Sequence, residues 1–119
     1  MTVSTIIDKI NKLKPNALDE KMIIDFINDV EKEIAINIME LIDFELASIE
    51  NKSVELLAPA PYENVYFDYV AAKIDYFNGD AELYALSSRQ FNSTMSDLKS
   101  FCIRKGIAPS FKGIKTNYF

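Results

Sequence analysis

Histidine and tryptophan are absent from this 119-residue sequence, and cysteine occurs once, at Cys102. The lack of histidine excludes Ser-His and Cys-His catalysis, histidine general bases and most zinc sites. A single cysteine excludes a disulfide within the chain. Because Cys102 follows Phe101 in an apolar stripe, we interpret it as a buried, inert thiol rather than a nucleophile.

Long apolar runs are also missing. No run approaches the roughly 18 residues that a membrane span needs, and Asp8, Lys9 and Lys12 interrupt the apolar residues at the N-terminus. The sequence therefore predicts neither a membrane partner nor a secretory signal, and we expect the protein to be made and kept in the cytoplasm. Glycine and proline are scarce, at 3 and 4 residues, and 49% of the residues are hydrophobic. We therefore expect one globular domain over residues 1–119.

The net charge of −5 is unfavourable for a free nucleic-acid binder. The charge is also unevenly distributed. Residues 16–50 carry ten acids against two lysines, whereas residues 104–119 carry four basic residues and no acid. This pattern has two interpretations, which the sequence leaves open. The acidic middle and the basic tail meet between neighbouring subunits, or they are an ordinary solvated face and a loose tail.

Apolar residues at helical spacing predict an all-α fold, a small bundle of about four helices. The first helix has Thr2 or Ser4 as its cap and ends before Pro15. The second follows a cap at Asn16 or Asp19 and carries its apolar stripe on to Leu41. Ile36 and Met39 broaden that stripe, so we expect its end to be enclosed. The period is lost at about 42–58, where we expect an extended linker or a short hairpin.

The third helix is expected to have Pro61 in its first turn and to reach Phe77, and the fourth to run from about Ala81 to Lys105. Asn78-Gly79-Asp80 between them looks like a stop, a left-handed turn and a new cap. Apolar and aromatic residues nevertheless recur every seven positions across Gly79, so a continuous helix is a rival. A helix of over forty residues would extend roughly 60 Å, and we favour a break or sharp kink because it is more compact.

Few residues suggest chemistry. A carboxylate metal site can be imagined at Glu31, Glu33, Glu40 and Asp43, but we interpret these acids as a solvated face because no histidine assists them. The serines lack a base partner, and no glycine-rich phosphate loop is present. We therefore predict no catalytic, metal or cofactor-binding residue and no enzymatic activity.

Four tyrosines crowd one segment, at Tyr62, Tyr66, Tyr69 and Tyr76. Aromatic rings with polar tips are typical of interfaces, and core packing of an aromatic-rich helix explains them equally well. One helix cannot turn all these rings inward, so we expect some to be exposed or to meet a neighbour. Base stacking is disfavoured, because acids flank the rings.

The C-terminal residues 107–119 combine apolar and basic side chains without a helical period. We interpret them as an assembly arm that docks onto another surface, with fraying as the alternative. The residues proposed for this arm are Phe111, Lys112, Lys115, Tyr118 and Phe119.

One ordered set of motifs resembles a known family. The run from Glu55 to Tyr66 contains Ala58-Pro59-Ala60-Pro61-Tyr62, and it continues through Tyr69, Ile74-Asp75-Tyr76, Asn78-Gly79-Asp80, Tyr84 and Phe91-Asn92. With Leu13-Lys14-Pro15-Asn16 and Ile27-Asn28-Asp29-Val30-Glu31 before it, this order is similar to that of the head-tail connector (head-completion) proteins of tailed phages and prophages of Gram-positive bacteria. The resemblance covers roughly residues 13–92. The family-motif residues taken as interface candidates are Pro59, Pro61, Tyr62, Tyr66, Tyr69, Asp75, Tyr76, Asn78 and Gly79.

The resemblance implies a helical adaptor that assembles as a ring below the portal protein and extends the DNA channel. Its expected partners are further copies of itself, the portal, and the next head-completion or tail protein, with no cofactor. It would lie at the head-tail junction of the virion, after a time in the host cytoplasm. DNA would pass through without sequence-specific binding, so an acidic lumen is favourable. The acids expected to face this channel are Asp25, Asp29 and Glu33.

Two other classes of function remain open on the sequence. One is a different phage-encoded helical module, such as a tail-completion protein or a small regulatory adaptor without catalytic activity. The other is an enzyme or nucleic-acid binder, which the missing histidine and the acidic charge oppose. A neighbourhood of portal, scaffold and capsid genes would favour the connector.

Overall fold

A computed structural model describes residues 1–106 of the chain, and within these residues the secondary structure is helical. In order, the elements are α1 (Val3–Leu13), α2 (Glu20–Glu33), the π-helix η1 (Ile34–Ile38), α3 (Asn64–Phe77) and α4 (Ala81–Arg104). The predicted all-α bundle of about four helices is confirmed. The proposed assembly arm at Phe111, Lys112, Lys115, Tyr118 and Phe119 lies outside the described residues.

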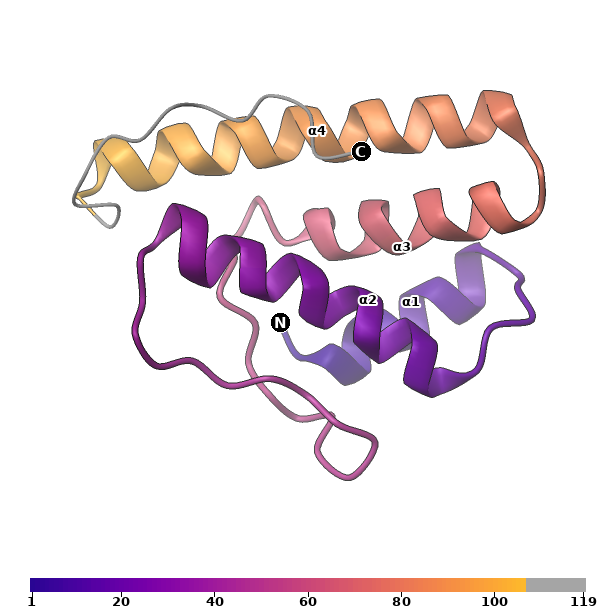
Figure 1. Cartoon of the computed structure of the whole chain (residues 1–119), viewed down its shortest axis with the longest axis horizontal. Helices are drawn as coiled ribbons and strands as arrows, with labels where there is room; N and C mark the ends of the chain where they lie inside the picture. Colours follow the sequence, from indigo (N-terminus) through magenta and orange to yellow (C-terminus); the bar gives the residue numbers. More distant parts are fainter. Residues whose placement is uncertain (107–119) are drawn as a thin grey trace.

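Helix α3 is at the centre of the bundle (Figure 1). It packs along α4 on one side and against α2 and α1 on the other. The largest side chains fully enclosed between these helices include Ile10, Ile27, Tyr66, Phe91 and Leu98. Every helix therefore buries one stripe against α3 or a neighbour of α3, as the helical spacing predicts.

Local signals set most helix ends where the sequence indicates them. Thr2 caps α1 by accepting a hydrogen bond from the amide of Thr5 at 3.3 Å, and Asp19 caps α2 through the amide of Met22 at 2.8 Å. At the far end of α4, Gly106 adopts a left-handed φ of 71°. Cys102 is buried, as expected, and burial raises the pKa of its thiol.

The break at Gly79 is confirmed. Helix α3 ends at Phe77, Gly79 takes a φ of 73°, and Asp80 caps α4 by accepting from the amide of Leu83 at 3.0 Å. The turn lets α4 fold back along α3 (Figure 1). The seven-residue apolar series that crosses the turn thus belongs to two antiparallel helices. Val70, Phe91 and Leu98 of this series are buried, whereas Phe77 beside the turn is 54% exposed.

Three details of the helix predictions were wrong. Pro61 lies in a turn before α3 rather than in its first helical turn, because α3 begins at Asn64. The second helix does not carry its stripe to Leu41, since α2 gives way to η1, which ends at Ile38. Leu41 and Ile36 are exposed, at 37% and 50%, so the end of this stripe is less enclosed than expected.

Residues 39–63 form one long irregular segment between η1 and α3, as the loss of period at about 42–58 indicates (Figure 1). It contains a tight turn with an antiparallel bridge between Ser48 and Asn51 and a second isolated bridge between Thr2 and Glu55. Asn28 of α2 fastens the segment by hydrogen bonds to both the amide and the carbonyl of Ala47, at 3.1 and 3.0 Å. Backbone bonds from Val3 to Val54, from Ser4 to Lys52 and from Leu56 to Met1 hold its second half against the N-terminus.

Candidate functional site

The motif residue Tyr66 lies in the core, where it forms a hydrogen-bonded hub with Glu31. Its hydroxyl donates to the Glu31 carboxylate at 2.6 Å and accepts from the amide of Ala58 at 3.0 Å. Glu31 also accepts from the amide of Leu57 at 3.0 Å. The hub therefore joins α2, α3 and the segment before the two motif prolines.

Glu31 corrects the interpretation of its neighbourhood as a solvated acidic face. Its exposure is only 1%. Burial raises the pKa of Glu31, while the Tyr66 hydroxyl and the Leu57 amide oppose this by favouring the carboxylate. The polar side of a helical pattern predicts a hydrated charge, but Tyr66 of α3 and the amide of Leu57 donate to Glu31 in place of water.

The other motif residues before α3 shape the entry to that helix. Pro59 is partly buried and Pro61 exposed, with a cis peptide between Ala60 and Pro61. The Pro59 carbonyl accepts from the amide of Tyr62 at 2.8 Å. The Tyr62 ring packs on Phe101 of α4, with centroids 5.2 Å apart. This turn thereby brings the irregular segment onto α4.

Asp75 is a buried junction between three helices. Its carboxylate forms an ion pair with Lys14 at the end of α1 and accepts from the hydroxyl of Ser87 on α4 at 2.9 Å. Its backbone carbonyl accepts from the amide of Asp80 in the turn at 3.0 Å. Because both carboxylate oxygens have partners and the side chain is enclosed, Asp75 supports the fold rather than an open surface.

Tyr69 is half-buried, whereas the end of α3 is open to solvent. The Tyr69 ring packs against Phe91 at 5.1 Å, and Lys73 lies over it at 5.2 Å. Tyr76 is 64% exposed and contacts Tyr84 at 5.7 Å. The four tyrosines thus divide between core and surface.

Asn78 and Gly79, which follow α3, are exposed, and a cavity of about 300 Å³ lies at this end of the helix. Its lining residues are Asp75, Tyr76, Gly79, Asp80, Ala81 and Tyr84.

The three acids predicted to face a channel are spaced four residues apart on α2, so they follow one side of this helix. Asp25 and Asp29 are exposed, and Glu33 is partly exposed. Asp25 pairs with Lys21 at 3.1 Å, and Glu33 accepts from the Asn37 side chain at 2.7 Å. Burial raises the pKa of Tyr69, and the charges of Asp29 and Glu33 raise it further. Asp29 and Glu33 therefore lie near Tyr69 of α3, whereas Asp25 lies beside the turn at residues 47–50.

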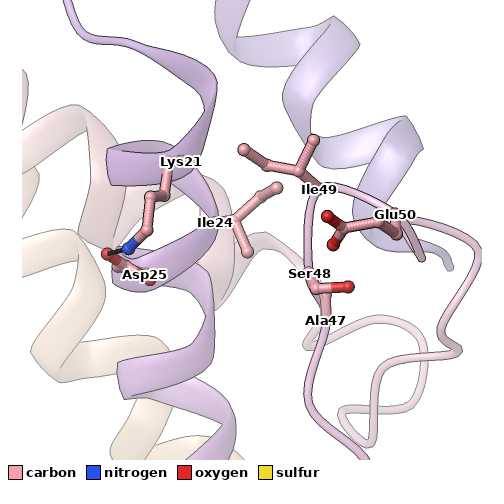
Figure 2. Close-up of a pocket in the computed structure, with 7 residues that line it drawn as sticks. All are labelled: Lys21, Ile24, Asp25, Ala47, Ser48, Ile49 and Glu50. Atoms are coloured by element: carbon pink, nitrogen blue, oxygen red, sulfur yellow. Dashed lines mark hydrogen bonds and ion pairs between the residues drawn. The ribbon is translucent and has the colours of Figure 1, made fainter.

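A shallow cavity of about 270 Å³ separates α2 from the turn that follows Ala47. Figure 2 shows Ile24 and Ile49 at this space, with the Lys21–Asp25 pair on the helix and Glu50 on the turn. Ile24 is buried, whereas Ile49 is 49% exposed. Three of its seven lining residues are apolar, and the charged ones are Asp25, its partner Lys21, and Glu50. This lining suits a segment with apolar and basic side chains better than a small polar substrate.

Sequence reasoning missed an exposed surface around this cavity. We call residues 36–50 the acidic-apolar strip, because its exposed apolar residues alternate with acids and it contains no basic residue. Ile42 is 95% exposed, which is extreme for its residue type. The loss of helical period was the available signal, but period alone does not show which apolar residues find a partner. The exposed apolar members are Ile36, Leu41, Ile42, Leu46 and Ile49.

One carboxylate in the described part of the chain has an unsatisfied buried oxygen. Asp68 of α3 has one oxygen out of contact with water and without a hydrogen-bond partner. Burial raises the pKa of Asp68 from 3.8 to about 6, and the positive charge of Lys9 lowers it in part. Lys9 itself donates to Asn64 at 2.7 Å and lies 4.7 Å from the Phe67 ring centre.

Within residues 1–106, no three Asp, Glu or Cys side chains gather in a way that could hold a metal ion. No helix in the same part of the chain is both long and apolar enough to cross a bilayer. Comparison with protein-family models, with curated proteins and with solved structures finds no match. The head-tail connector resemblance therefore rests on the residues of this chain alone.

Proposed function

We propose that this protein is a head-tail connector, or head-completion adaptor, of a tailed phage or prophage. In this proposal it docks under the portal protein as a ring and extends the DNA channel towards the tail. The observation that carries the proposal is the ordered motif from Pro59 to Asn92 in a helical chain of this size.

The placement of the motif residues supports the proposal. Tyr66 and Asp75 are polar residues that connect helices inside the bundle, so their presence in a motif is explained by the fold that they hold. Tyr76, Asn78 and Gly79 lie at the exposed end of α3. An adaptor needs both sets, because the first keeps its shape and the second remains available for contacts.

The surface also suits a protein that works by association. The acidic-apolar strip leaves several large apolar side chains in water, and exposed apolar patches of this kind are typical of interaction sites. A ring requires two different, complementary faces on each copy. The acidic residues 16–50 and the basic residues 104–119 supply opposite charges for such faces.

Electron microscopy of the purified protein mixed with the portal protein of its own gene cluster tests the proposal. We expect a ring of additional density beneath the portal, which is missing from portal alone. Binding to the tail end instead would favour the tail-completion alternative. Virions built and filled normally without the protein, or a substrate turned over by the pure protein, would reject the connector function.

The proposed assembly arm has its own test. Removing residues 107–119 should abolish docking to the portal or to a neighbour while leaving the helix content, measured by circular dichroism, unchanged. The helix content should persist because the described helices end at Arg104, and the deletion leaves all of them in the chain. Normal docking by the shortened chain would reject the assembly arm and leave the connector proposal standing.

A further inference from the structure

The acidic-apolar strip is held in place while its apolar side chains stay in water. Met39 and Ala47 are buried at 8% exposure, and the Asn28 side chain binds both backbone groups of Ala47. Between and just after these two anchors, Ile42, Leu46 and Ile49 point away from the core at 95%, 38% and 49% exposure. A surface that is fixed in advance loses little conformational entropy when a partner covers it.

The charge of the strip indicates the chemistry of its partner. Asp43, Glu45 and Glu50 are exposed among the apolar residues, and no lysine or arginine lies between residues 33 and 51. The best occupant is therefore a segment in which basic and apolar residues are interleaved. Apolar contacts would provide affinity, and the charges would provide orientation and specificity.

The sequence of this chain contains a segment of that description. Residues 104–119 combine Arg104, Lys105, Lys112 and Lys115 with apolar residues and contain no acid. The apolar residues of this segment are Ile107, Ala108, Phe111, Ile114, Tyr118 and Phe119. The charges of the two segments thus have opposite signs, and both have large apolar side chains.

We propose that the acidic-apolar strip of one copy binds the basic C-terminal segment, residues 104–119, of a second copy. The cavity between Ile24 and Ile49 accepts an apolar side chain of that segment, and Glu50 at this cavity, with the other acids of the strip, meets its lysines (Figure 2). The inference deepens the proposed function, since it names the contact that would join neighbours in the ring.

Carbodiimide cross-linking of the full-length protein tests this contact, because the reagent joins carboxylates directly to lysine amines. Equal amounts of ¹⁴N- and ¹⁵N-labelled protein are mixed over a concentration series, and cross-linked peptides are identified by mass spectrometry. We expect Lys112 or Lys115 joined to Asp43, Glu45 or Glu50 in peptides of mixed isotope. The yield should rise with protein concentration and fall with added salt.

A matched pair of variants separates the strip from apolar surface in general. Ile42→Asp should lower the yield of mixed-isotope links roughly tenfold, because it removes a large apolar contact from the interface. Leu86→Asp on α4, where Leu86 is 55% exposed, should leave the yield unchanged. Circular dichroism of both variants should match the unmodified protein, since both side chains are exposed.

Three results would overturn the inference. In the first, every cross-linked peptide carries a single isotope, which would mean that the segment covers the strip of its own chain. In the second, the lysines are joined mainly to acids elsewhere, such as Glu82 and Asp97. In the third, no link to the strip forms even at the highest protein concentration. The connector function fails separately, because it is tested by density beneath the portal. Mixed-isotope links without portal docking would keep this contact and reject the connector.

Discussion

At the scale of single residues, the most consequential group is the hub of Glu31 and Tyr66. A buried carboxylate is costly unless its oxygens receive hydrogen bonds. Glu31 receives them from the Leu57 amide and the Tyr66 hydroxyl, which lie 26 and 35 residues further along the chain, respectively. The hub therefore stabilises only the correctly assembled fold, and each of its members depends on the others.

Removal of the Tyr66 hydroxyl tests this dependence. Tyr66→Phe leaves Glu31 with one donor fewer and the amide of Ala58 without its acceptor. We expect the free energy of unfolding, measured with urea, to fall by about 2 kcal/mol. Tyr76→Phe is the matched control, since Tyr76 is 64% exposed, and it should change stability by less than about 0.5 kcal/mol. Equal effects of the two changes would contradict the hub.

Asp68 gives stability a defined dependence on pH. Its pKa is about 6 in the folded protein against an ordinary value of 3.8, so between these values the folded protein binds more protons than the unfolded chain. Stability contributed by Asp68 is therefore present below about pH 4 and is lost as the pH rises through 6. Asp68→Asn should remove this loss and raise the free energy of unfolding at pH 7.5 by about 1 kcal/mol, which is less than the full shift implies because solvent screens a partly exposed carboxylate. The measurement is urea unfolding of the unmodified protein and of Asp68→Asn at pH 4.5 and 7.5. If the free energy of unfolding changed equally with pH in both, Asp68 would not be the titrating group.

At the scale of elements, the turn between α3 and α4 depends on backbone geometry. Gly79 has a φ of 73°, and a Cβ added there would meet nothing within 4 Å. Any cost of substitution is therefore the strain of a left-handed backbone. We expect Gly79→Ala to lower the free energy of unfolding by about 1 kcal/mol and Gly79→Asn to lower it by less, because asparagine tolerates this conformation. Thermal unfolding of both variants measures these changes. Equal losses of stability in Gly79→Ala and Gly79→Asn would contradict this explanation.

Most helix ends could be predicted from the sequence because local signals mark them. The start of α3 is an exception, since it has no side-chain cap and was predicted too early. Thr2, Asp19, Asp80 and Gly106 act within a few residues, and the apolar stripes lie between them. The π-helix η1 and the bonds of Asn28 to Ala47 could not be predicted, since they depend on contacts across the fold. Periodicity likewise assigned Leu41 to the buried stripe, although it is 37% exposed.

The candidate surfaces were predictable only in part, for the same physical reason. The aromatic crowding correctly indicated that some tyrosines would be exposed, but not that Tyr76 would be open and Tyr66 enclosed. The charge pattern showed that residues 16–50 are acidic, yet it treated Glu31 as hydrated. Whether a side chain is covered depends on the path of residues 39–63, and no short-range pattern determines that path.

At the scale of the whole molecule, the acidic side of α2 would influence DNA if it lines the channel. An acidic wall repels phosphates and would let DNA slide. Replacing Asp25, Asp29 and Glu33 by lysine should therefore slow DNA ejection from assembled virions and alter DNA retention, with the difference shrinking as salt is added. Glu82→Lys with Asp97→Lys is the control, because both acids are exposed on α4. Unchanged ejection in the α2 variant would reject a channel-facing role.

The long separation of the partners around α3 has a consequence for how the chain folds. Helices α3 and α4 are joined by only three residues, whereas the Lys14–Asp75 pair closes a loop of 61 residues. Shorter loops cost less entropy to close, so the hairpin of α3 and α4 should form before α1 docks. In pulse-labelled hydrogen exchange, amides of α4 should accordingly gain protection before those of α1. During translation, the apolar face of α1 can complete its packing only after α3 has left the ribosome.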